Sequence, residues 1–201
     1  MATKVRMWLA ILTLAAVLIF VSLSGPTQAA GDKDMRPDVL KIAGMYKSGK
    51  AADAETAAIK IAKAFEETSD LMHLFRARNK GGIGWGRAPL GPNPAEDGLE
   101  KKLQLLADPK KPLANVAKEA AAAEEAAHDL AAMAQLIRNK TPGKDGPAGK
   151  TKKAWNEWSE QMRDASLELA KAAGAKNAAG IAKAAAKVNS TCNACHAKFK
   201  E

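Results

Sequence analysis

Residues 155–199, "WNEWSEQMRDASLELAKAAGAKNAAGIAKAAAKVNSTCNACHAKF", contain two stretches in which apolar residues recur at alternating steps of three and four. That spacing is typical of one face of an α-helix, and it predicts helices at about 151–173 and 177–200. Between them, "GAKN" (174–177) favours a tight turn, so the two helices are expected to be antiparallel neighbours. Each helix carries a narrow apolar stripe, which further helices must cover because the stripe cannot bury itself in water.

The upstream part of the chain has the same helical character. Alanine dominates, β-branched residues are few, and no segment alternates as a strand does. Helical spacing predicts three more helices, at about 36–48, 51–77 and 113–139. Four long helices with short to moderate connections favour a mostly antiparallel bundle. The predicted fold is therefore all-α, a four-helix bundle with an additional short N-terminal helix.

A long Gly/Pro-rich insert at 79–112 interrupts this pattern. It contains six Gly and five Pro and begins "NKGGIGWGRAPLGPNP". A loop of this length is usually functional or partly structured, and Leu99, Leu103 and Leu106 suggest a short helix within it. Trp85 could shield the edge of a cofactor, although a lone loop aromatic more often anchors the loop to the core.

Residues 1–30 are predicted to be a signal peptide. Lys4 and Arg6 precede the apolar run "MWLAILTLAAVLIFVSL", which is followed by "SGPTQAA" with small residues at its end. The folded domain is then 31–201, in the periplasm or otherwise exported. The alternative is an N-terminal membrane anchor, because the run is about as long as the shortest spanning helices. Outside the cytoplasm a thiol pair is expected to be oxidised, bound to a metal or used covalently.

The chain is basic, with a formal net charge of +9, of which Lys4 and Arg6 belong to the leader. Such an excess can steer acidic partners or anionic surfaces. Most lysines alternate with acidic residues along the predicted helices, and no arginine-rich stripe is interleaved with aromatics, which argues against nucleic acid as a partner. No nucleophile and base are arranged as in a hydrolase, so we do not expect an enzyme.

Both cysteines of the chain lie in the motif C-x-x-C-H, as Cys192, Cys195 and His196. The two cysteines fall on the apolar stripe of the last helix, and His196 lies four residues beyond Cys192 on the same flank. This motif is typical of c-type haem attachment, in which the thiols bond the porphyrin vinyl groups and the imidazole binds iron. The motif thus predicts one haem c per chain, with His196 as the proximal ligand.

Other interpretations of the cysteine pair have less support in the sequence. A thioredoxin-like pair would need a βαβ context, and a zinc site would need about four ligands. A disulfide between residues three apart closes a very small loop and stabilises little. A helical bundle with such a disulfide and no haem remains the alternative outside the haem proteins.

The C-terminal segment resembles the class II cytochromes c, the cytochrome c′ family. The resemblance rests on "TCNACHAKFK" at the chain end, preceded by helix, tight turn and helix in "EQMRDASLELAKAAGAKNAAGIAKAAAKVNS". It covers 151–201 and is only architectural before that. It implies a four-helix bundle, thioether bonds from Cys192 and Cys195, and proximal ligation by His196. The extra N-terminal helix and the insert depart from the family pattern.

The ligand on the other face of the iron is left open by the sequence. By resemblance, low-spin family members use a Met from the first bundle helix, whereas an apolar residue fills this space in cytochromes c′ proper. Met72 lies on the apolar stripe of the predicted 51–77 helix and His73 on its flank, with core packing and solvation as their ordinary roles. His128 and Met133 are weaker candidates, and open five-coordinate iron is the alternative.

Three arginines are candidates to pair with the haem propionates, namely Arg163 and either Arg76 or Arg78, because a buried carboxylate needs a partner. A surface position is the ordinary role of each. Trp155 and Trp158 are expected to anchor the fourth helix in the core, with stacking on the porphyrin as the alternative.

The sequence therefore predicts an exported monohaem c-type cytochrome that transfers electrons and is not an enzyme. Its expected partners are redox proteins, acidic or membrane-associated, and the resemblance is compatible with a homodimer. The alternative function is a five-coordinate haem protein that binds small gases such as NO or CO in the manner of cytochrome c′.

Overall fold

The computed structural model describes residues 34–65, 67–108, 110, 116–141, 144–146 and 149–199. All regular secondary structure in these ranges is helical, which confirms the predicted all-α class. The predicted leader at 1–30 lies outside the described residues, as do the first three residues of the predicted 113–139 helix. No helix in the described ranges is long and apolar enough to cross a membrane.

The helices follow one another along the chain with two short 3-10 turns in the insert. Their bounds are α1 (Arg36–Lys47), α2 (Ala51–Ala62), α3 (Thr68–His73), η1 (Arg78–Lys80), η2 (Pro94–Asp97), α4 (Leu99–Ala107), α5 (Val116–Arg138), α6 (Lys152–Gly174) and α7 (Ala178–Phe199).

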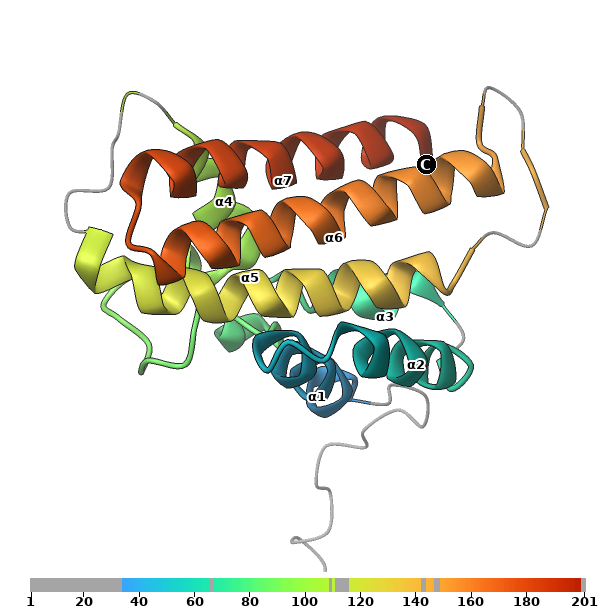
Figure 1. Ribbon diagram of the computed structural model, residues 1–201, viewed down its shortest axis with the longest axis horizontal. Coiled ribbons are helices and arrows are strands. Elements are labelled where there is room, and N and C mark those ends of the chain that lie inside the picture. The colour runs from blue at the N-terminus through green and yellow to red at the C-terminus, as the bar shows by residue number, and fades with distance from the viewer. Residues whose placement is uncertain are drawn as a thin grey trace, which may run out of the picture. The chain divides into compact units, whose positions relative to one another are not determined.

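The three longest helices, α5, α6 and α7, lie side by side in that order and alternate in direction (Figure 1). The tight turn predicted at 174–177 is confirmed, since α6 ends at Gly174 and α7 begins at Ala178. Lys176 adopts a left-handed φ of 53° in this turn, and the Asn177 side chain accepts a hydrogen bond from Gly180 N at 3.0 Å. The turn thus ends one helix and caps the next.

Helix α5 lies at the centre of the core. It packs against α6 on one side and against α1 and α2 on the other (Figure 1). Every residue from 130 to 137 is buried, and four of these eight positions are Ala or the polar Gln135. Small side chains allow the neighbouring helices to approach closely, and larger residues such as Leu130 fill the remaining space, each contributing about 1.5–3 kcal/mol when fully buried.

The prediction of one continuous helix over 51–77 is wrong. The chain leaves helical geometry after Ala62 and re-enters it at Thr68, with Glu67 in an extended conformation. Phe65 is buried in the gap, and its carbonyl accepts a hydrogen bond from Lys140 Nζ, which also lies over the Phe65 ring. Lys140, two residues beyond the end of α5, thus holds the chain between α2 and α3, and α3 is a separate element.

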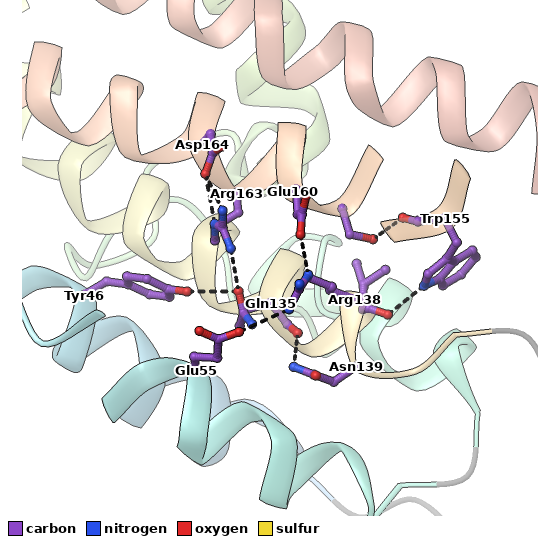
Figure 2. A network of polar contacts seen from close by, with 11 residues as sticks. Tyr46, Glu55, Gln135, Arg138, Asn139, Trp155, Glu160, Arg163 and Asp164 are labelled. Carbon is purple, nitrogen blue, oxygen red and sulfur yellow. Dashed lines mark hydrogen bonds and ion pairs between the residues drawn. The ribbon is translucent and has the colours of Figure 1, made fainter. Parts of the chain in front are cut away.

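A network of polar side chains ties α5 to the helices on both sides (Figure 2). Tyr46 Oη and Arg163 Nη1 both donate to Gln135 Oε1, at 3.3 and 3.2 Å. One turn further on, Arg138 pairs with Glu160 of α6 at 2.8 Å and with Glu55 of α2 at 3.2 Å. Buried polar groups cost free energy unless they are hydrogen-bonded, so this network favours one register of the four helices that it joins.

Candidate functional site

A cavity among the described residues has a volume of about 540 Å³ and a mostly apolar wall. Small-molecule and cofactor sites usually measure about 300–1,000 Å³. The cavity brings together Met72 and His73 with all three motif residues. Its lining residues are Thr68, Ser69, Met72, His73, Phe75, Arg76, Glu100, Leu103, Ile137, Trp155, Trp158, Ser159, Met162, Asn189, Thr191, Cys192, Asn193, Cys195, His196 and Phe199.

Helix α7 contributes the motif residues to the wall. Cys192 and Cys195 are free thiols, both half-buried, and Cys192 packs against the hydrophobic core. Burial raises the pKa of Cys192 to about 12, with a smaller contribution from the neighbouring Cys195, and burial alone raises the pKa of Cys195 to about 11. Both thiols are therefore neutral at pH 7. His196 is exposed and lies on the same wall.

Helix α3 supplies a thioether and an imidazole to the same cavity. Met72 is half-buried and packs against the core, whereas the adjacent His73 is exposed. α3 itself is anchored by Leu71, which is fully buried. Both side chains are of types that bind haem iron, so one short helix carries both of the predicted distal candidates.

An aromatic cluster lines the part of the cavity next to Phe199, the last residue of α7. The Phe199 ring packs edge-on against Trp155 and Trp158, with centroid separations of 4.9 and 5.6 Å. Trp155 Nε1 donates to the Ile137 carbonyl at 2.8 Å (Figure 2). The cluster therefore holds the end of the motif helix against both α6 and α5. Trp155 is buried, in agreement with the expected role as a core anchor.

Of the three candidate arginines, Arg76 alone is among the residues that line the cavity. Its guanidinium has no ion-pair partner among the described residues. Arg163 instead pairs with Asp164 at 2.8 Å and donates to Gln135 (Figure 2). Arg78 is paired with Asp97 at 2.7 Å. Both are thus already engaged by protein groups, and Arg76 is the arginine available to an anionic group in the cavity.

The two weaker distal candidates, His128 and Met133, lie away from this cavity. Met133 is fully buried in the core. His128 borders a second cavity of about 210 Å³ next to Lys47, Arg87 and Asp129. Burial lowers the pKa of His128, and its Nδ1 has no hydrogen-bond partner in the described part of the chain.

The insert folds back on the core, as the commoner role of Trp85 implies. Trp85 is 5% exposed and belongs to the main hydrophobic cluster. It is not among the residues that line the 540 Å³ cavity. The short helix expected from Leu99, Leu103 and Leu106 is confirmed as α4, which buries all three leucines.

Several residues that line the 540 Å³ cavity were not predicted from the sequence. Asn189 lies one turn before Cys192, so the helical spacing that selected His196 would also have selected Asn189. Leu103 and Glu100 of α4 line the cavity because α4 packs against α7. No local signal in the sequence indicates that contact, because it joins segments about 90 residues apart.

In the described ranges, no three His, Cys, Asp or Glu side chains are clustered so as to hold a metal ion directly. A haem iron takes only one or two ligands from the protein, and a cluster of that kind is not required for it. Comparison of the chain with protein-family models, with curated proteins and with solved structures finds no match.

Proposed function

We propose that the protein is an exported monohaem c-type cytochrome of the class II type that carries electrons. The observation that supports the proposal best is the composition of one cavity wall. Cys192, Cys195 and His196, adjacent on one helix, line a mostly apolar cavity of about 540 Å³ together with Met72 and His73. The thiols, an imidazole and a second candidate ligand are the groups that a covalently bound haem requires.

In this proposal Cys192 and Cys195 hold the porphyrin through thioethers, and His196 Nε2 or Nδ1 supplies the proximal ligand. When bound, a haem supplies a one-electron ferric–ferrous couple. The apolar wall, including Leu103 and Ile137, keeps water away from the ring, which helps to set the potential. Arg76 is the proposed partner of a propionate, since the two other candidate arginines are already paired.

The distal ligand is proposed to come from α3. Met72 and His73 both line the cavity, and they are adjacent in sequence. A second candidate function, gas binding at five-coordinate iron, is favoured by one observation: Met72 packs against the hydrophobic core. If packing holds its sulfur away from the iron and His73 stays in solvent, the position is open to NO or CO.

The four-helix bundle and the export to the periplasm are part of the same proposal. α5, α6 and α7 would be three members of a four-helix bundle, and the neighbours α1 and α4 contact its outer members. The leader would direct export to the periplasm, and the basic excess would favour acidic or membrane-associated redox partners. A protein that only carries electrons converts no substrate, so in this proposal the chain is not an enzyme.

The test is an absorption spectrum of the purified protein after native export. A Soret band that stays with the polypeptide on a denaturing gel supports covalent attachment. A wild-type protein without a Soret band would overturn the proposal. The double variant Cys192→Ala/Cys195→Ala should lose the covalent band. Thr191→Ala is the matched control, since Thr191 lines the same cavity beside Cys192 but has no bond to haem in this proposal.

Adding carbon monoxide to the ferrous protein separates the two haem functions. A low-spin ferrous spectrum that does not change with the gas supports the electron carrier. A high-spin spectrum that converts fully supports gas binding. Met72→Leu and His73→Leu then identify the ligand, because only one of them should abolish the low-spin spectrum.

A further inference from the structure

One ion pair joins the beginning and the end of the segment that connects α3 to α4. Arg78 lies shortly after α3, and Asp97 lies two residues before the start of α4. Arg78 Nε and Nη2 donate to the two carboxylate oxygens of Asp97 at 2.8 and 2.7 Å, and Arg78 N donates to Asp97 Oδ2 at 3.1 Å. We call this pair the clasp and the residues between its members, 79–96, the strap.

Backbone hydrogen bonds join the strap and the start of α4 to the residues that follow α3. Ile83 N donates to the Leu74 carbonyl at 2.9 Å, and Leu99 N donates to the Phe75 carbonyl at 3.0 Å. These carbonyls belong to the two residues directly after His73. The start of α4 is therefore bonded to the end of α3, and the clasp lies beside that junction.

Glycines allow the close approach at this junction. A Cβ on Gly82 would lie 1.7 Å from the Arg76 carbonyl oxygen. At Gly84, whose φ is +76°, a Cβ would lie 2.4 Å from Asp97 Oδ2 and 2.5 Å from Arg78 Cγ. The strap thus packs directly onto the clasp and onto the chain that leaves α3, at distances that no side chain would permit.

The clasp is largely shielded from solvent. The side chain of Asp97 is 10% exposed and that of Arg78 is 26% exposed. Burial alone would raise the pKa of Asp97, but the hydrogen bonds from Arg78 outweigh it and hold that pKa below its ordinary value. A bidentate arginine–carboxylate pair fixes orientation as well as distance, so the clasp fixes η1, which follows α3, relative to η2, which precedes α4.

The helices before and after the strap, α3 and α4, both line the cavity of the proposed haem. α3 contributes Met72 and His73, and α4 contributes Glu100 and Leu103. α4 also packs against α7, the helix that carries the cysteines. One set of contacts from the motif helix to the segment after α3 therefore passes through α4 and the clasp, while α3 itself also contacts α5.

We propose that the Arg78–Asp97 clasp is a positioning element, which holds the segment that follows α3 against the start of α4 and thereby keeps Met72 and His73 at their places on the cavity wall. Neither Arg78 nor Asp97 lines the cavity, so they act through α3. The inference rests on the proposed haem function for the meaning of that wall, and on the contacts of the strap for the positioning itself.

A second arginine–aspartate pair in the same segment provides a matched control. Arg87, at the far side of the strap, pairs with the buried Asp129 of α5 through bonds of 2.9 and 2.7 Å. Breaking that pair also removes a bidentate ion pair, but one that joins the strap to α5, to which Arg87 N stays bonded through Glu125. Asp97→Ala therefore weakens the contact beside α3, whereas Asp129→Ala weakens the contact of the strap with α5.

The experiment uses the full chain as exported and two measurements. Asp97→Ala should speed amide hydrogen exchange in residues 71–77 and speed carbon monoxide binding to the ferrous protein, each by about tenfold, because losing one partner of a shielded pair favours local opening. Asp129→Ala should leave both rates within about twofold of the wild type. Arg78→Lys, which keeps the charge but loses the fork, should give intermediate values and guards against an Asp97 variant that fails to fold.

Two results would overturn the inference. One is an Asp97→Ala protein whose exchange at 71–77 equals that of the wild type. The other is equal acceleration of gas binding in Asp97→Ala and Asp129→Ala, which would mean that loss of stability alone controls access. Hydrogen exchange does not require haem, so a wild-type protein without a Soret band would overturn the proposed function while exchange still decides whether the clasp holds α3.

Discussion

Phe199 packs edge-on against Trp155, with ring centroids 4.9 Å apart and ring planes at 86°. Phe199 is three residues beyond His196, so this contact lies within one turn of the proposed proximal ligand. Trp155 is in turn bonded to α5 through the Ile137 carbonyl. The last turn of α7, which as a helix end would otherwise fray, is held in the core by this pair.

Phe199→Leu should therefore lower the free energy of unfolding by about 1–2 kcal/mol. Edge-to-face pairs contribute about 0.5–1.5 kcal/mol each beyond the area that they bury, and Phe199 makes two. Urea denaturation measures the change. Trp158→Phe keeps a ring beside Phe199, so it should lower the free energy of unfolding clearly less than Phe199→Leu does. Equal losses in the two variants would mean that the edge contacts are not what holds the turn.

In the proposed haem protein, Arg76→Met should lower the midpoint potential by about 30–60 mV, because removing a positive charge near the ring favours the ferric state. Redox titration of the holoprotein measures it. Arg163→Met is the control, since Arg163 is bonded to Gln135 and Asp164 instead of lining the cavity. A shift caused by Arg163→Met but not by Arg76→Met would show that the propionate partner is misassigned.

Tyr46→Phe and Arg163→Met should each cost about 1 kcal/mol of stability, the usual net value of one hydrogen bond. Both side chains donate to Gln135 Oε1, and Gln135 Nε2 already has no partner among the described residues. The double variant leaves the buried amide without a donor to its oxygen, so its loss should exceed the sum of the two single losses. A double-mutant cycle that proves additive contradicts the shared acceptor.

The clasp should make the protein sensitive to acid. The folded-state pKa of Asp97 lies below its ordinary value, so its contribution to stability is complete above the unfolded pKa of 3.8 and is lost as the pH falls through the lower folded value. Unfolding curves between about pH 2 and pH 6 measure this slope. Asp97→Asn should flatten it, whereas Asp145→Asn, on an exposed residue, should not. An unchanged slope in Asp97→Asn would assign the acid sensitivity to other carboxylates.

Gly82→Ala should destabilise the protein by about 3–5 kcal/mol, because the new Cβ collides with the backbone of Arg76 and the strap must move. That Cβ would lie only 1.7 Å from the Arg76 carbonyl oxygen. Gly91→Ala, in the same strap, has nothing within 4 Å of its new Cβ and should change stability by no more than about 0.5 kcal/mol. Thermal unfolding of both variants is sufficient. Similar values for both would contradict the packing of the strap.

Much of the helical order could be predicted from local spacing. Helices α6 and α7, the turn at 174–177 and the short helix around Leu103 all follow the period of apolar residues, which is a property of neighbouring positions. The break between α2 and α3 could not be predicted in this way. Phe65, in this break, accepts a hydrogen bond from Lys140, which lies two residues beyond the end of α5 and 75 residues away along the chain.

Some residues of the candidate site could likewise be predicted from the sequence, and others could not. The chemistry of Cys192, Cys195 and His196 is carried by residue type and spacing in one helix, so the sequence alone was sufficient to single them out. Which groups share a cavity with them depended on how separate helices pack. Packing placed Met72, His73 and Arg76 on that wall, and it engaged Arg163 elsewhere in a buried network. Helix periodicity depends on local backbone geometry, whereas the wall of a cavity depends on contacts between distant segments, and only the tertiary structure decides those.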